Sequence, residues 1–201
     1  MTPLEHIRSE LAGVHDLMAA APADDWDRPS ACDGFLVRDV VGHLEVSRRL
    51  PLPPLLVRLV THGFRLNAAA YTVSKEEGRR PHADLLADLA AAASKPRNKG
   101  LSKLQPLKAM FADVVTHHED IRWGLGARRT MPRELAHDVL STAVALRGVG
   151  TWGTAQRARG LRLHATDVEW TWGTGPTVSG NGRCTVARTR WAFGGSCGAQ
   201  R

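Results

Sequence analysis

Apolar residues recur every three or four positions along most of the first 147 residues, and this spacing predicts a chain built mainly of α-helices. The first helix is expected to begin at Thr2-Pro3-Leu4-Glu5, which has the residues of a capping box, and to run to about Ala21. A second helix is expected from about Leu36, after a connection over residues 22–35. The same spacing predicts later helices at residues 55–74, 82–93, 106–124 and 133–147.

The segments between and after these helices have other patterns. Residues 76–80 are charged and are expected to be solvated, and residues 94–105 form a polar, basic stretch that is typical of a loop. After Gly148, apolar and polar residues alternate around Leu163 and Trp170, which predicts a hairpin or the first strands of a small sheet. No period is visible from Asn181 onward.

We therefore expect three parts along the chain. Residues 1–150 would form a helical bundle, and residues 151–180 would be a linker and the β segment of a truncated C-terminal domain. Residues 181–201 would be an unpatterned, disordered tail.

Length and composition are those of a globular protein with one principal core. The chain has 201 residues, of which 43% are hydrophobic. Its longest apolar run, around residues 50–57, contains three prolines and ends at Arg58, well short of the ~20 residues that a membrane span requires. No signal peptide is visible, and three cysteines suit a reducing compartment better than a disulfide framework. We expect a cytoplasmic protein with no membrane partner.

The net charge of +7 raises the question of nucleic-acid binding, but the charge is concentrated at one end. Residues 183–201 hold four arginines and no acids, and the rest of the chain has 23 basic against 20 acidic residues. That body shows no basic stripe with interleaved aromatic residues. The distribution argues against nucleic acid as a partner.

The helix expected at residues 106–124 carries the candidate chemistry. Met110, Asp113, His117 and Asp120 share one stripe at the border of its apolar face. Polar side chains beside a core face cost free energy unless a partner satisfies them, and a metal ion is one such partner. His43, on the apolar face of the second helix, could meet this stripe inside a bundle.

The candidate metal ligands are therefore His43, Asp113 and His117. Two imidazoles and a carboxylate with an open position are typical of catalytic zinc sites, and they also suit iron, nickel or manganese. A histidine on an apolar face is also commonly a hydrogen-bonded core residue, so spacing alone leaves both interpretations of His43 open. Cys32, before the second helix, is interpreted as a small buried packing residue rather than a reactive thiol.

The polar neighbours of these residues have their own interpretations. Asp120 would either orient a ligand ring or pair with Arg122 or Arg38 instead. His118 and Glu119 are expected to face solvent.

Two stretches of the sequence resemble a known protein family. One runs from Trp26 to Leu44 and reads WDRPSACDGFLVRDVVGHL; the other runs from Asp113 to Arg122 and is followed by Leu125-Gly126. Together they resemble the mycothiol-dependent maleylpyruvate isomerase family, whose N-terminal domain is a DinB-like metal-binding four-helix bundle of the up-down-down-up type. Residues 159–176 are similar to the region that joins this bundle to a C-terminal α+β domain.

The resemblance implies a site and a chemistry. It places the metal ligands at His43, Asp113 and His117, with zinc or another divalent metal and mycothiol as cofactors. The bound thiolate would add to an activated double bond, giving cis–trans isomerisation, or displace a leaving group, as in an S-transferase. The characterised isomerases have glutamate where this chain has Asp113, so closer helices or a weaker ligand are expected.

Other residues also depart from, or add to, the pattern of the resembling family. Leu36 stands where the family has a polar helix-capping residue, and Asp33 is expected to take over that role. A dicarboxylate substrate would need arginine forks, for which Arg65, Arg79 and Arg80 are candidates, although surface arginines are common.

We expect a metal-dependent isomerase or S-transferase that acts on a small-molecule thiol and an electrophilic or dicarboxylate substrate, as a monomer or homodimer. The alternative is a non-catalytic metal- or ligand-binding DinB-like protein without a complete C-terminal domain. The alanine- and leucine-rich helix expected to open that domain does not follow Gly180, and a shifted reading frame near Asn181 or a truncated chain would explain this.

Overall fold

The computed structural model describes residues 1–49, 52–96, 105–146 and 154–180. Within these ranges the chain is mainly helical with a small sheet at the C-terminal end, which confirms the predicted fold class. The chain divides into two compact units, residues 1–128 and 129–201, so the helix expected at 133–147 belongs to the second unit. The expected tail at 181–201 and most of the expected loop at 94–105 lie outside the described residues.

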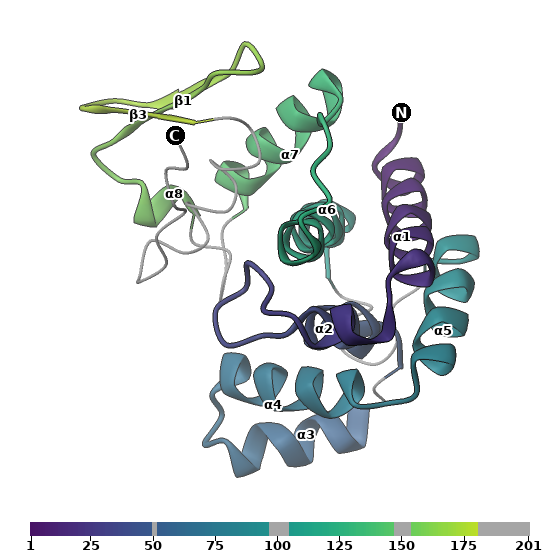
Figure 1. The fold of residues 1–201 in the computed structure, drawn as a ribbon. Coiled ribbons are helices and arrows are strands. Elements are labelled where there is room, and N and C mark those ends of the chain that lie inside the picture. Colours follow the sequence, from purple (N-terminus) through teal and green to yellow (C-terminus); the bar gives the residue numbers. More distant parts are fainter. Residues whose placement is uncertain (50–51, 97–104, 147–153, 181–201) are drawn as a thin grey trace. The chain divides into compact units, whose positions relative to one another are not determined.

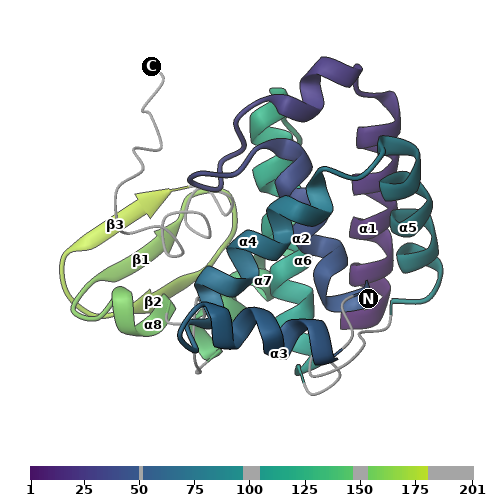
Figure 2. The ribbon, with the colours of Figure 1, turned by 90° about the horizontal axis from the view of Figure 1, so that it is seen from below.

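The first unit is a bundle. Its elements are α1 (Pro3–Ala20), the short 3-10 helix η1 (Ala23–Asp27), α2 (Val37–Arg49), α3 (Leu52–Thr61), α4 (Leu66–Gly78), α5 (His82–Ser94) and α6 (Leu107–Leu125). Helices α1 and α2 each contact both α5 and α6, which closes a ring of four helices. Helix α4 packs on α2, and α3 packs on α4 (Figures 1 and 2).

The capping box predicted for α1 is present. The Thr2 hydroxyl accepts from the Glu5 N–H at 3.3 Å, and the Glu5 carboxylate accepts from the Thr2 N–H at 2.6 Å. The apolar stripe of α1 is buried from Ile7 to Met18, as its spacing predicts. It meets Leu85 and Leu89 of α5, both fully buried, and burial of each such side chain stabilises the fold by roughly 1.5–3 kcal/mol.

Helices α2 and α4 approach unusually closely because glycines face each other across their contact. A Cβ atom at Gly42 would lie 2.4 Å from the Ser74 carbonyl oxygen, and one at Gly78 would lie 2.7 Å from the Arg38 carbonyl oxygen. No side chain fits at either position without separating the backbones. This close contact brings residues of α4 within reach of His43, which follows Gly42 directly.

The single helix expected over residues 55–74 is a wrong prediction, because the chain reverses within it. Helix α3 ends at Thr61, and Gly63 and Phe64 follow with φ of +59° and +61°. Glycine tolerates this left-handed conformation, and the Phe64 N–H donates to the Leu59 carbonyl at 2.7 Å, which ends the helix. Helix α4 then continues to Gly78, so most of the segment expected to be solvated at 76–80 is helical.

The second unit contains α7 (Arg133–Ala145), the one-turn helix α8 (Thr154–Arg157) and the strands β1 (Arg162–Ala165), β2 (Thr171–Gly173) and β3 (Thr177–Gly180). The sheet order is β2-β1-β3, with β1 antiparallel to β2 and parallel to β3. Trp170 is buried, and its indole N–H donates to the Ser141 hydroxyl of α7 at 3.1 Å. In the described parts of both units, every helix is too short or too polar to cross a membrane.

Candidate metal centre

The three predicted ligands lie together where α2 packs on α6. His43 projects from α2, and Asp113 and His117 lie one turn apart on α6. The Asp113 carboxylate is between the two rings, with one oxygen 3.6 Å from His43 Nε2 and the other 3.7 Å from His117 Nε2. One ligand atom from each residue lies within 4.8 Å of the others, so a single ion can contact all three.

The ring of His117 is oriented by Asp120. Its Nδ1 lies 2.9 Å from the Asp120 carboxylate, and both side chains are almost fully buried. The carboxylate can only accept, so Nδ1 carries the proton and Nε2 keeps its lone pair. Of the two roles predicted for Asp120, the geometry favours the orienting one, since Arg38 pairs with Asp27 and Arg122 bonds to His118.

The ring of His43 is oriented in the same sense by a residue that the sequence did not point to, Ser74 of α4. The Ser74 hydroxyl lies 2.6 Å from the Ala70 carbonyl and 3.1 Å from His43 Nδ1. Because a hydroxyl has one hydrogen, which it donates to the Ala70 carbonyl, its oxygen accepts from the His43 Nδ1–H. Both histidines therefore direct an Nε2 lone pair toward Asp113, as metal-binding imidazoles require.

The shorter acid at position 113 does not leave a gap. Its carboxylate oxygens lie 3.6 and 3.7 Å from the two Nε2 atoms, so the helices sit close enough for an aspartate to reach both rings. His117 is 1% exposed, whereas the side chains of His43 and Asp113 are 25% and 20% exposed. The cluster is thus closed on the His117 side and open on the other, where an external ligand can approach.

Aromatic side chains lie next to His43. The Phe35 ring lies 6.4 Å from the His43 ring and stacks on Tyr71 at 5.0 Å. The Tyr71 hydroxyl donates to the Gly34 carbonyl, and the Lys75 ammonium lies 5.0 Å from the Tyr71 ring centre. These contacts place an aromatic pair next to His43, with the Lys75 ammonium beside Tyr71 and 3.6 Å from the Asp39 carboxylate.

The expectation that His118 faces solvent is wrong. His118 is 1% exposed, with Nδ1 2.7 Å from the Glu10 carboxylate of α1 and Nε2 accepting from the Arg122 guanidinium at 3.0 Å. Gly13 makes room for the ring, because a Cβ there would lie 2.8 Å from His118 Cε1. The residue joins α6 to α1 instead of reaching water. Glu119 is only partly exposed.

The cap predicted at Asp33 is also replaced by another residue. The Asp39 carboxylate accepts from the Leu36 N–H at 2.9 Å and so caps α2 from inside its first turn. Cys32 is buried, as expected, but it is not surrounded only by apolar atoms. Its sulfur can reach a common point with His117 and Asp120.

The arginines expected to bind a dicarboxylate are not gathered at the cluster. Arg80 pairs with Asp88 at 2.7 Å and with Glu77 at 3.3 Å, and Arg65 and Arg79 are exposed. Arg80 is therefore engaged in holding the α4–α5 junction together.

A closed ring of helices with a convergent His-Asp-His cluster defines a DinB-like metal-binding domain. The family model of the mycothiol maleylpyruvate isomerase N-terminal domain matches residues 7–122, which is more than half of the chain and includes the whole cluster. The chain belongs to this family. No curated protein and no solved structure matched it.

Proposed function

We propose that this protein is a metal-dependent enzyme of thiol chemistry, a mycothiol-dependent isomerase or S-transferase. In this proposal a divalent ion, zinc by preference, is held by His43, Asp113 and His117. The observation that carries the proposal is the convergence of two oriented imidazole Nε2 atoms on one carboxylate, with one side of the cluster open.

The net charge of the three protein ligands favours an anionic external ligand on the metal. Two neutral imidazoles and one carboxylate contribute a single negative charge, so a divalent ion would leave the centre with one net positive charge. Such an ion would favour the thiolate form of a bound thiol, which is the nucleophile. The partly exposed His43 and Asp113 border the side from which the thiol would enter.

The chain's own residues would orient the reactants. Ser74 and Asp120 fix the two rings, so the donor atoms need little rearrangement when a ligand arrives. The stacked Phe35 and Tyr71 lie beside His43, and their rings would suit the carbon skeleton of an electrophile. Lys75, beside Tyr71 and 3.6 Å from the Asp39 carboxylate, would be a candidate for an acidic group on that substrate.

The family supports mycothiol as the thiol, because the matching domain is named for a mycothiol maleylpyruvate isomerase. A cis–trans isomerase and an S-transferase share the first step, attack by the thiolate on an electrophilic carbon. They differ in whether the thiol leaves again or stays in the product. A low-molecular-weight thiol stays reduced in the cytoplasm, which is the compartment that the proposal requires.

Metal analysis of the purified protein tests the site. We expect close to one divalent ion per chain in the wild type and a large loss in His43→Ala and in Asp113→Asn. His137→Ala is the matched control, because that side chain is 53% exposed on α7 and should leave the metal content unchanged. Unchanged stoichiometric metal in His43→Ala would overturn the ligand assignment.

Turnover tests the activity separately. The metal-loaded protein is mixed with mycothiol and either a cis-unsaturated dicarboxylate or an electrophile with a leaving group, and the product is identified by mass spectrometry and NMR. Thiol-dependent product that is lost after chelation supports the enzyme. Bound metal without turnover of either substrate class would favour the second candidate, a non-catalytic metal- or ligand-binding member of the family.

A further inference from the structure

A second group of metal-binding side chains lies behind His117, on the side away from His43. Cys32, His117 and Asp120 offer one sulfur, one nitrogen and one oxygen within 4.8 Å of one another, and all three residues are buried. We propose that this group is a second metal site, which takes soft divalent ions such as Cd²⁺, and that its occupation excludes metal from the His43 site. The second site itself does not depend on the enzymatic proposal, but the exclusion rests on the His43 metal site proposed above, since both sites use His117.

Donor chemistry separates the two sites. Thiolate ligands select soft ions, whereas imidazole and carboxylate alone suit harder or borderline ones. Cys32 and Asp120 as thiolate and carboxylate would carry two negative charges, which a divalent ion neutralises. A neutral assembly suits a place where the three residues are at most 5% exposed, because an uncompensated charge there would be costly.

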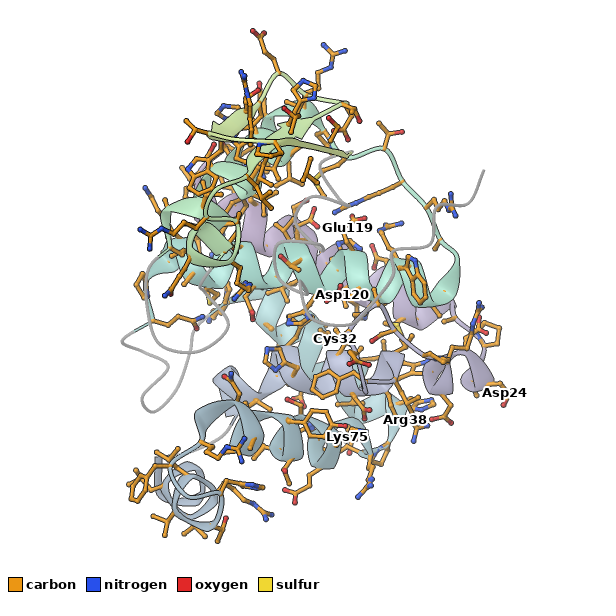
Figure 3. The ribbon with its side chains drawn as sticks, turned by 90° about the vertical axis from the view of Figure 1, so that its left-hand side faces the viewer. Asp24, Cys32, Arg38, Lys75, Glu119 and Asp120 are labelled. Atoms are coloured by element: carbon orange, nitrogen blue, oxygen red, sulfur yellow. The ribbon has the colours of Figure 1, made fainter. Side chains whose placement is uncertain are left out.

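The loop that carries Cys32 is held in place against Asp120. The Cys32 N–H donates to the Ser30 hydroxyl at 3.1 Å, and the Phe35 N–H donates to the Cys32 carbonyl at 2.9 Å. The Ala31 N–H donates to the Asp120 carbonyl at 3.3 Å, which ties the loop to the last turns of α6. Figure 3 shows Cys32 and Asp120 near each other, from the loop and from α6. The thiol is thus positioned by backbone contacts rather than by chance packing.

The tautomer of His117 makes the two sites mutually exclusive. A neutral imidazole carries one proton, and in this structure Nδ1 holds it, facing Asp120 at 2.9 Å. A metal on the Asp120 side must bind Nδ1, so that proton moves to Nε2 and the Cys32 thiol releases its own proton to solvent. The protonated Nε2 then faces Asp113 at 3.7 Å and has no lone pair for an ion in the His43 site. Each chain therefore holds metal in one site or the other.

Cadmium titration of the full-length, metal-free protein tests this inference, with ultraviolet absorption of the cadmium–thiolate bond as the readout. The titration is carried out in Cys184→Ser/Cys197→Ser protein, where Cys32 is the remaining thiol. We expect the thiolate band to grow to one equivalent, to disappear in the further variant Cys32→Ser, and to persist in His43→Ala. Circular dichroism checks that each variant is folded.

A competition experiment tests the exclusion. When Cd²⁺ is added to zinc-loaded protein of the same background, the thiolate band should rise as zinc is released, with total bound metal remaining at one ion per chain. No thiolate band at saturating Cd²⁺, or simultaneous binding of two ions, would overturn the inference. Failure of the His43 site alone would appear differently, as a thiolate band that grows normally in a protein that binds no zinc at His43.

Discussion

Two side chains outside the candidate ligand set fix the orientation of its two histidine rings. Asp120 accepts a hydrogen bond from the Nδ1–H of His117, and Ser74 accepts one from the Nδ1–H of His43. The first relationship could be predicted, because His117 and Asp120 are three residues apart on one helix. The second could not, because it joins residues 31 apart on different helices. The burial of His118 could not be predicted for the same reason, because its partner Glu10 lies 108 residues away in the sequence.

The orienting role of Ser74 gives a prediction at the level of one hydroxyl group. Ser74→Ala leaves the His43 Nδ1–H without its acceptor, so the ring loses its fixed orientation. We expect metal affinity, measured by competition with a chromogenic chelator, to fall about 10–100-fold, as is typical when the partner of a metal-binding histidine is removed.

Thr72→Ala is the matched control, since Thr72 makes the same bond within α4, to the Ala68 carbonyl, without contacting either histidine. Equal affinities in Ser74→Ala and the wild type would show that packing alone orients His43.

At the scale of helices, most of the architecture followed from apolar spacing and capping residues, and the misplaced boundaries have a local cause. Gly63 interrupts an otherwise continuous apolar pattern, and glycine occurs both inside helices and just beyond their ends. Only the left-handed backbone at Gly63 and Phe64 separates α3 from α4. Sequence reasoning likewise found His43 but not the glycine contact that brings α4 beside it.

The contact between α2 and α4 can be tested through its glycines. Gly42→Ala places a methyl group 2.4 Å from the Ser74 carbonyl oxygen, so the helices must separate. We expect a loss of about 1–3 kcal/mol in the free energy of unfolding, measured in urea, together with weaker metal binding because Ser74 moves from His43. Gly78→Ala, on the facing helix, should change both quantities in the same direction. Wild-type stability in both variants would contradict the close contact.

The contact between η1, α2 and α5 predicts that the stability of the protein depends on pH. His82 stacks on Trp26 at 4.0 Å and lies 3.2 Å from the Arg38 guanidinium. Burial lowers the pKa of His82 below its model-peptide value of 6.5, and Arg38 lowers it further, while Asp27 raises it. The unfolded chain therefore binds this proton at a higher pH than the folded protein does. The stabilisation is complete above the unfolded pKa and is lost as the pH falls toward the folded one.

We expect His82→Gln to flatten this dependence, so that the variant loses less unfolding free energy than the wild type between about pH 7.5 and about pH 5.5. Urea unfolding of the metal-free proteins at both pH values gives the comparison. His137→Gln, with an exposed ring, should behave like the wild type. A slope unchanged by His82→Gln would assign the dependence to other groups.

At the scale of the whole molecule, the candidate chemistry is confined to one of the two compact units. His43, Asp113 and His117, with the orienting Ser74 and Asp120, all lie within residues 1–128. We therefore expect a fragment of residues 1–128 to bind one divalent ion with the affinity of the full chain, within about 3-fold, since no part of the donor set or its supports is removed. Isothermal titration with Zn²⁺ on both proteins makes this comparison, after circular dichroism shows that the fragment is helical. Turnover by the fragment is measured as well, and full metal affinity with lost activity would assign substrate recognition to residues 129–201. A folded fragment that binds metal much more weakly would mean that the second unit supports the metal site itself.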